Sequence, residues 1–169
     1  MASEDNLPKS REFIALTVNG KRVKIEVDSR MTLAELLREE LRLTGTKVGC
    51  NRAECGSCTV ILDGNPVYSC TILAVEAIGR KVQTIEGLGQ DKKLHPLQEA
   101  FIEHDALQCG YCTPGMIMAT KTLLDKNPHP TEDDVKRAIS GNTCRCGAYA
   151  NIIKATLAAS QKITRRGSA

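Results

Sequence analysis

The sequence predicts an α+β chain whose N-terminal half mixes strands with a helix and whose C-terminal half is entirely helical. In the N-terminal half, Val23, Ile25 and Val27 alternate with charged residues, which is the two-residue period of a half-buried strand. Beyond residue 94, apolar residues recur at the spacing of an amphipathic helix. We therefore expect five segments: a flexible leader (1–11), a first domain (12–86), a linker (87–94), a second domain (95–162) and a flexible tail (163–169).

Local signals place the elements of the first domain. Asn19-Gly20 separates two strand patterns within residues 12–27, and both residues accept positive φ, so a tight hairpin is expected. Thr32 and Glu35 have the spacing of a capping box, which predicts that a helix begins there. One face of this helix is expected to carry Leu33, Leu36, Leu37 and Leu41. The remaining strands are expected at residues 59–62, 67–70 and 82–85, with residues 63–66 as a turn.

Four helices are expected in the second domain. Thr113 and Pro114 are a favourable N-cap and first-turn pair for the second helix. Thr131 predicts the start of the third helix, and Gly141 is expected to provide its C-terminal stop. The first and fourth helices are indicated by apolar and small residues at helical spacing, namely Leu97, Phe101 and Ile102, and then Ile152, Ile153, Thr156, Leu157 and Ser160.

Composition and charge exclude several classes of function. The chain has 169 residues and a formal net charge of +3, and its charges are interspersed, so no basic surface for nucleic acid is expected. No apolar run approaches membrane-spanning length, and the N-terminus lacks the layout of a signal peptide. We therefore expect a cytoplasmic chain with neither a membrane nor a nucleic-acid partner. Thiols stay reduced in that compartment, so eight cysteines favour metal binding over disulfides.

The first cysteine set consists of Cys50, Cys55, Cys58 and Cys70, with the spacing C-x4-C-x2-C-x11-C. Its first three members reproduce the plant-type ferredoxin spacing for a [2Fe–2S] cluster. Neighbouring glycines would let the backbone curl around a cluster and its amides donate hydrogen bonds to sulfur. Zinc sites usually bring close C-x2-C pairs, and Cys50 and Cys55 are too far apart for one. The spacing predicts a [2Fe–2S] cluster, with zinc, a disulfide or free thiols as the alternatives.

The second cysteine set consists of Cys109, Cys112, Cys144 and Cys146, with the spacing C-x2-C-x31-C-x-C. This spacing alone is compatible with zinc as well as with a cluster. A thioredoxin-like redox pair is disfavoured because no βαβ pattern surrounds Cys109 and Cys112. Both pairs precede expected helices, where free backbone amides and the helix dipole favour anionic thiolates.

Other candidate residues have structural interpretations. His95, His104 and His129 share no metal-ligand spacing, and two of them precede prolines as turn residues do. Met116 and Met118 fall in an expected helix and are interpreted as packing residues. No nucleophile–base arrangement is present in the sequence, so we expect no catalytic residue in this chain.

Two segments give the second cysteine set a more specific meaning. Residues 108–116 read QCGYCTPGM, and residues 141–147 read GNTCRCG. Together with the loop 49–58 and the segment 95–100, they resemble the iron–sulfur subunits of molybdenum hydroxylases, the xanthine oxidase family. That family includes carbon monoxide dehydrogenase and the aldehyde, quinoline and nicotinate oxidoreductases. The resemblance extends from about residue 14 to residue 158 and includes all eight cysteines, which favours a second [2Fe–2S] cluster over zinc.

The resemblance implies a fold, cofactors and partners. It implies a β-grasp, plant-type ferredoxin-like domain followed by a four-helix [2Fe–2S]-binding domain. It also implies a large partner subunit that holds a molybdenum–pterin cofactor, expected in a dinucleotide form, and a medium subunit that holds FAD. Gln108 matches a glutamine that hydrogen-bonds the pterin, and Cys146 matches the cluster ligand beside the pterin edge. The alternative for Gln108 is a polar residue at a helix end that bonds only to the local backbone.

The function expected from these features is electron transfer. Electrons would pass from the molybdenum–pterin centre to the cluster on the second cysteine set, then to the first set, and then to FAD or another acceptor. Two rival functions are a free-standing two-cluster ferredoxin and a non-redox, zinc-stapled interaction module. Aldehydes, N-heteroaromatic compounds, carbon monoxide and aromatic thioesters are all open as substrates of the complex.

Overall fold

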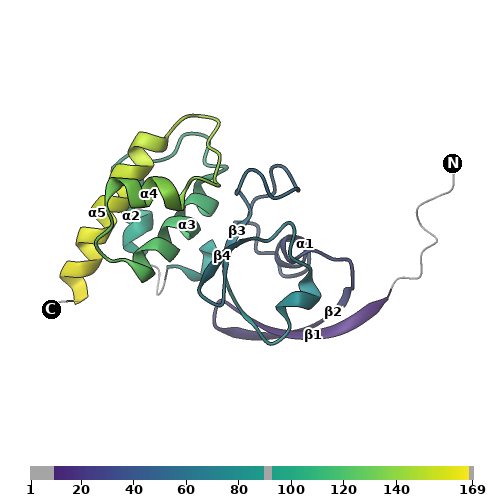
Figure 1. Ribbon diagram of the computed structural model, residues 1–169. Coiled ribbons are helices and arrows are strands. Elements are labelled where there is room, and N and C mark those ends of the chain that lie inside the picture. Colours follow the sequence, from purple (N-terminus) through teal and green to yellow (C-terminus); the bar gives the residue numbers. More distant parts are fainter. Residues whose placement is uncertain (1–9, 90–92, 168–169) are drawn as a thin grey trace.

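The structure consists of a sheet domain and a helical domain packed against each other (Figure 1). It is a computed structural model that describes residues 10–89 and 93–167. Most of the expected leader, the middle of the expected linker and the last two residues of the expected tail lie outside the described residues. The combination of a mixed sheet with a separate group of helices confirms the expected α+β class.

The sheet domain is built on five strands in the order β2-β1-β5-β3-β4. β1 and β5 are parallel, and the other neighbouring strands are antiparallel. β1 and β2 form the expected hairpin, with φ of 49° at Asn19 and 78° at Gly20. The strands are β1 (Arg11–Val18), β2 (Lys21–Asp28), β3 (Thr59–Leu62), β4 (Asn65–Tyr68) and β5 (Lys81–Gln83).

A short helical segment packs against one face of the sheet. It consists of α1 (Leu33–Glu35) and the π-helical turn η2 (Leu36–Glu40). The capping box of Thr32 and Glu35 forms as expected. Leu33, Leu36 and Leu37 are fully buried, and burial of each such side chain contributes about 2 kcal/mol to folding.

The helix expected here is present, but after Glu35 it is π-helical rather than α-helical. The N–H of Leu41 donates to the carbonyl of Leu36 at 3.0 Å, five residues back, which is the pattern of a π turn. The chain leaves the turn at Arg42, whose φ is 56°. Leu41 contacts the same apolar core but stays partly exposed.

Two strand boundaries also differ from the expectation. Asp63 and Gly64 form the whole turn after β3 with positive φ at both positions, so Asn65 and Pro66 already pair with β3. The strand expected at residues 67–70 is therefore found at residues 65–68. The strand expected at residues 82–85 ends at Gln83 and is followed by the 3₁₀ turn η4 (Ile85–Gly87). A second 3₁₀ turn, η3 (Ala74–Ala77), lies between β4 and β5.

The described part of the second domain contains the four expected helices. Leu97, Phe101, Met116 and Ile152 form the centre of their shared core, and Leu88, from the expected linker, packs into the same core. Met116 and Met118 are buried, as expected of packing residues. The helices are α2 (Pro96–Glu103), α3 (Thr113–Lys126), α4 (Glu132–Ala138) and α5 (Tyr149–Gly167). None of the described helices is long and apolar enough to cross a membrane.

The helix ends correct three expectations. The capping box of Thr131 and Asp134 forms at the start of α4. However, Cys112 rather than Thr113 is the N-cap of α3, and the Thr113 side chain makes no capping bond. α4 ends at Ala138 without a left-handed glycine, so Gly141 has another role that is described below. α5 continues to Gly167, and residues 163–167 of the expected tail are therefore helical.

Candidate iron–sulfur centres

The first cysteine set is gathered by the loop that precedes β3 and by the end of β4. Three residues of this loop have positive φ: Asn51 and Ala53, between Cys50 and Cys55, and Gly56, between Cys55 and Cys58. The backbone therefore turns back on itself between the cysteines. Cys58 and Cys70 are buried at 2% and 4% exposure, whereas Cys50 and Cys55 are partly exposed. The set therefore has an inner pair and an outer pair.

Backbone amides surround the sulfur of the outer pair. The N–H groups of Glu54 and Cys55 donate to Cys50 Sγ at 3.3 and 3.4 Å. Hydrogen bonds from the backbone of Arg52, Cys55 and Glu54 lower the pKa of Cys50 to about 7, which favours its thiolate. Burial instead raises the pKa of Cys58 to about 11, so the inner thiol needs a bound metal to ionise at neutral pH.

The second cysteine set lies in two turns that lead into helices. Cys109 and Cys112 precede α3, and Cys144 and Cys146 precede α5. Gly110 and Gly147 have φ of 81° and 80°, which lets each turn fold back over its cysteines. Cys144 is buried, Cys112 and Cys146 are partly exposed, and Cys109 is exposed.

Hydrogen bonds and burial differentiate these four thiols. The backbone of Tyr111 and the side chain of Cys146 lower the pKa of Cys109. Burial raises the pKa of Cys112 to about 12, with the neighbouring Cys144 adding to the shift. Burial acts in the same direction on Cys144, but hydrogen bonds from Ala148, Cys112 and the turn amides outweigh it and lower its pKa.

In both sets the thiols meet in pairs, and this pairing fits a two-iron cluster. Cys50 contacts Cys55 and Cys58 contacts Cys70, while Cys109 contacts Cys146 and Cys112 contacts Cys144. A [2Fe–2S] cluster takes two protein ligands on each iron, whereas a zinc ion needs its four ligands around one centre. None of the eight cysteines forms a disulfide, so all of them are available as ligands.

An unpartnered hydroxyl next to the second set supports the same fit. Thr113 Oγ1 is the one buried side-chain oxygen or nitrogen without a hydrogen-bond partner among the described residues. Thr113 directly follows Cys112. A buried hydroxyl without a partner costs free energy, and a cluster held by Cys112 would offer it a sulfur acceptor.

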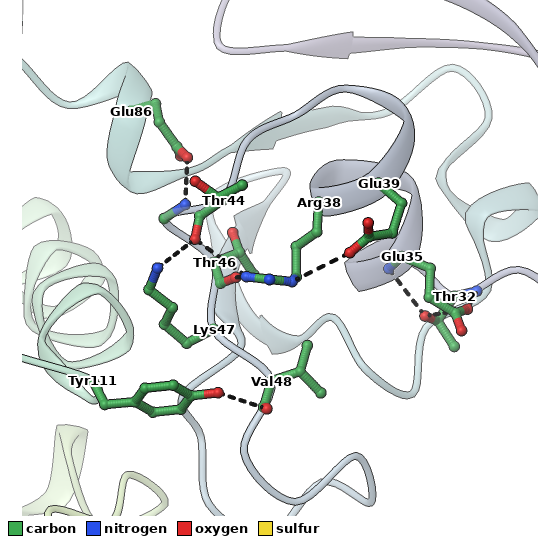
Figure 2. A network of polar contacts seen from close by, with 11 residues as sticks. Thr32, Glu35, Arg38, Glu39, Thr44, Thr46, Lys47, Val48, Glu86 and Tyr111 are labelled. Atoms are coloured by element: carbon green, nitrogen blue, oxygen red, sulfur yellow. Dashed lines mark hydrogen bonds and ion pairs between the residues drawn. The ribbon is translucent and has the colours of Figure 1, made fainter.

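The chain that leads into the first cysteine set is held by side chains from elsewhere in the sheet domain (Figure 2). Arg38 Nη1 donates to the carbonyls of Thr44 and Thr46 at 3.2 and 2.7 Å, and Lys47 Nζ donates to the same Thr44 carbonyl at 2.7 Å. Thr46 is itself buried. The Arg38 bonds tie residues 44–46 to the π turn η2, and the Lys47 bond lies within the segment itself.

Two further contacts extend this attachment across the molecule (Figure 2). The N–H of Gly45 donates to Glu86 Oε1 at 2.7 Å, which joins the segment to η4. Tyr111, between the first two cysteines of the second set, donates its hydroxyl to the carbonyl of Val48 at 2.8 Å. The segment that leads into Cys50 is thus bonded to the turn that carries Cys109 and Cys112.

The structure brings Gln108 to the second cysteine set. Gln108 Nε2 lies 3.4 Å from the backbone carbonyl of Cys146, and the contact is on the surface. Gln108 therefore contacts a distant turn, and the alternative that it bonds only to its local backbone does not hold. His95, in contrast, caps α2 by accepting from the N–H of Leu97, in agreement with its interpretation as a turn residue.

Sequence reasoning did not identify Asn142, Tyr68 and Tyr111 as parts of these centres. Asn142 and Tyr68 join the two cysteine sets at a buried contact that is described below. Asn142 and Tyr111 lie inside the two motifs of the second set, so their closeness to ligands was a usable signal. Tyr68 lies two residues before Cys70 and had the same signal, although its partner, 73 residues away, could not be predicted.

Comparison with known proteins agrees with the two-centre arrangement. Residues 16–83 match the family of 2Fe-2S iron–sulfur cluster binding domains, and residues 84–157 match the [2Fe-2S] binding domain family. The two matches meet between β5 and η4. The chain therefore carries two [2Fe–2S]-binding domains, in agreement with the expected cofactors.

Relatives and solved structures place this pair of domains in one type of subunit. The nicotine 6-hydroxylase small subunit of Paenarthrobacter nicotinovorans is 48% identical, over 92% of this chain and 94% of the relative. The aldehyde oxidoreductase iron–sulfur-binding subunit of Escherichia coli is 46% identical, over 84% of this chain and 69% of the relative.

A crystal structure of quinoline 2-oxidoreductase from Pseudomonas putida 86 contains a chain with the same fold. That chain is 46% identical and superposes with a TM-score of 0.89, over 94% of this chain and 99% of its own length. Identity at this level over nearly the whole chain shows common family membership as well as a common fold. The protein belongs to the small iron–sulfur subunits of the molybdenum hydroxylase family, which are the electron-transfer subunits of heteromeric oxidoreductases.

Proposed function

We propose that this subunit relays electrons from a molybdenum–pterin centre in a larger partner subunit to FAD in a medium subunit or to another acceptor. The observation that carries the proposal is the presence of two cysteine sets, one per domain, whose thiols meet in pairs. The clusters supply the redox chemistry, and the protein holds them at fixed positions and tunes their potentials through hydrogen bonds and burial.

We assign Cys50, Cys55, Cys58 and Cys70 to the first [2Fe–2S] cluster. Cys109, Cys112, Cys144 and Cys146 are assigned to the second. The amides that donate to Cys50 Sγ and the Ala148 N–H, 3.5 Å from Cys144 Sγ, support the assignment because they stabilise negative charge on sulfur.

The second cluster is the one proposed to face the molybdenum–pterin subunit. Cys109 is exposed, and the Gln108 side chain contacts the backbone of Cys146 at the same surface. An amide here has one N–H on Cys146 and retains hydrogen-bonding capacity for a partner. We therefore propose that Gln108 and Cys146 contact the pterin, which is expected in a dinucleotide form.

The names of the relatives suggest a substrate class for the complex. Nicotine and quinoline, in the names of two of these proteins, are N-heteroaromatic compounds. The Escherichia coli relative is named as a subunit of an aldehyde oxidoreductase. We propose hydroxylation of an N-heteroaromatic compound or an aldehyde in the partner subunit, with this chain taking no part in substrate choice. We propose a cytoplasmic location, because thiols stay reduced there and eight cysteines assigned to clusters fit such a compartment.

The test is to purify the chain together with its copurifying subunits and to record electron paramagnetic resonance spectra after reduction. The proposal expects iron and acid-labile sulfide in equal amounts and two distinguishable [2Fe–2S] signals. A colourless protein without iron or sulfide would instead establish a zinc-stapled module. Full electron-carrier activity of the isolated chain, with no molybdenum subunit, would establish a free-standing ferredoxin.

A further inference from the structure

A buried contact joins the two cysteine sets. We call it the inter-set joint, and it consists of residues 141–143, which lead into Cys144, and residues 55–59 of the first-set loop. Asn142 is its central side chain and is only 6% exposed. Its Nδ2 donates to the carbonyl of Gly56 at 2.8 Å and to Thr59 Oγ1 at 3.1 Å. The amide of Asn142 therefore connects a turn of the helical domain to the loop of the sheet domain.

The backbone makes a third bond at the joint. The N–H of Thr143 donates to the carbonyl of Cys55 at 2.8 Å. Thr143 precedes Cys144, so a single hydrogen bond links a residue of the first cysteine set to the neighbour of a residue of the second. On the other side of Asn142, the Tyr68 hydroxyl donates to the carbonyl of Gly141 at 3.0 Å.

The joint leaves no room for larger residues. A Cβ at Gly56 would overlap the carbonyl of Gly141 and the amide of Asn142, and a Cβ at Gly141 would overlap the Tyr68 hydroxyl. Close packing on both sides means that the Asn142 amide cannot shift without moving backbone. This explains why Gly141 is a glycine although it does not terminate α4 in the left-handed conformation.

We propose that Asn142 is a positioning residue that sets the distance and electronic coupling between the two clusters. The proposal rests on the proposed electron-transfer function. Electron tunnelling weakens steeply with distance, and it is stronger through bonds than across a van der Waals gap. By holding the Thr143–Cys55 hydrogen bond closed, Asn142 maintains a bonded route between the ligand sets, and rigid support of this kind is needed wherever a site depends on sub-ångström placement.

Other contacts hold the two domains together without touching the clusters. Lys126 Nζ donates to Asn65 Oδ1 at 2.9 Å on the surface, and α3 packs against β3. The domains are therefore expected to stay associated when Asn142 is changed. What is lost is the local fit at the joint rather than the overall assembly.

The test compares Asn142→Leu with Ser160→Ala in the assembled enzyme. Leucine has the branching of asparagine and the same number of side-chain heavy atoms, but it is bulkier and cannot donate a hydrogen bond. Ser160 is equally buried at 6% and donates to the Pro128 carbonyl at 2.7 Å inside the helical domain. Its change to alanine therefore controls for the loss of a side-chain hydrogen bond at a buried residue away from the joint. Iron and sulfide content, the magnetic interaction between the two reduced clusters, and the rate of electron exchange between them are measured.

We expect both variants to retain both clusters. In Asn142→Leu the magnetic splitting should decrease or broaden and the exchange rate should fall severalfold, whereas Ser160→Ala should resemble the wild type in both. An unchanged splitting and rate in Asn142→Leu, or equal changes in the two variants, would overturn the proposal. If Asn142→Leu fails to assemble, Tyr68→Phe decides, since it removes only the bond to Gly141 and should give a smaller change in the same direction. A wild-type protein without two cluster signals would reject the proposed function itself.

Discussion

The first cysteine set is more deeply buried than the second set, whose Cys109 is exposed. Two of the first four sulfurs are almost fully buried, and their loop is held by Arg38, Glu86 and Tyr111. In the second set Cys144 is buried but Cys109 is exposed, and Gln108 lies beside it on the surface. Both clusters are proposed to exchange electrons with another subunit, so each set must reach the surface. The first set does so through its partly exposed outer pair, Cys50 and Cys55, and the second set through Cys109.

The largest expected effect comes from removing one ligand from each set. Cys58→Ser should abolish the first cluster and destabilise the sheet domain by several kcal/mol, because the free energy of metal binding is part of the folding free energy and the site is buried. Cys109→Ser should abolish the second cluster with a smaller fall in thermal stability, because its site is at the surface. Iron content and thermal denaturation measure both effects.

Equal falls in the thermal midpoint of the two serine variants would contradict the difference in burial. Retention of both clusters in either variant would contradict the ligand assignment. Ser160→Ala, which changes a buried residue that contacts no cysteine, is the control for a general loss of stability.

A change at the contact between the domains should affect both sets together. The Cβ of Gly115→Ala would overlap the carbonyl of Gly56 and approach that of Ser57 to 3.1 Å. Alanine in a helix is favoured over glycine by about 1 kcal/mol, so overpacking must outweigh this gain for the variant to be less stable. We expect a net loss of about 1–2 kcal/mol in the free energy of unfolding. Chemical denaturation measures it, and a more stable variant would show that α3 can move away from the loop.

The smallest expected effect separates the two sets again. Arg38→Met keeps the aliphatic stem but removes the donors to the Thr44 and Thr46 carbonyls. We expect a loss of about 0.5–1.5 kcal/mol in the free energy of unfolding and a broadened signal from the first cluster, with the signal of the second cluster unchanged. Lys136→Met, which removes an exposed ion pair on α4, is the matched control. A change in the electron paramagnetic resonance signal of the second cluster alone would contradict the conclusion that Arg38 holds the segment before the first cysteine set (Figure 2).

Local signals in the sequence determined much of the architecture. The Asn19-Gly20 hairpin, the capping boxes at Thr32 and Thr131 and the four helices follow from turn chemistry and apolar spacing, which act over a few residues. The cysteine spacing identified the first set, and the flanking motifs identified the second. The error at residues 65–66 arose because pairing with β3 begins directly after the Asp63-Gly64 turn, and strand pairing is not a local property of the sequence. The Cys112 N-cap and the π turn were not predicted either.

From the sequence by itself, cysteine spacing predicted the first cluster, and the family resemblance of the flanking motifs predicted the second, for which spacing alone left zinc open. Only the tertiary structure decided how the two sets are joined. Asn142, Tyr68 and Tyr111 have partners 86, 73 and 63 residues away, and no local pattern can specify a hydrogen bond between segments so far apart. These bonds exist because the sheet domain and the helical domain pack so closely at Gly56 and Gly115 that buried polar groups on each side must satisfy one another.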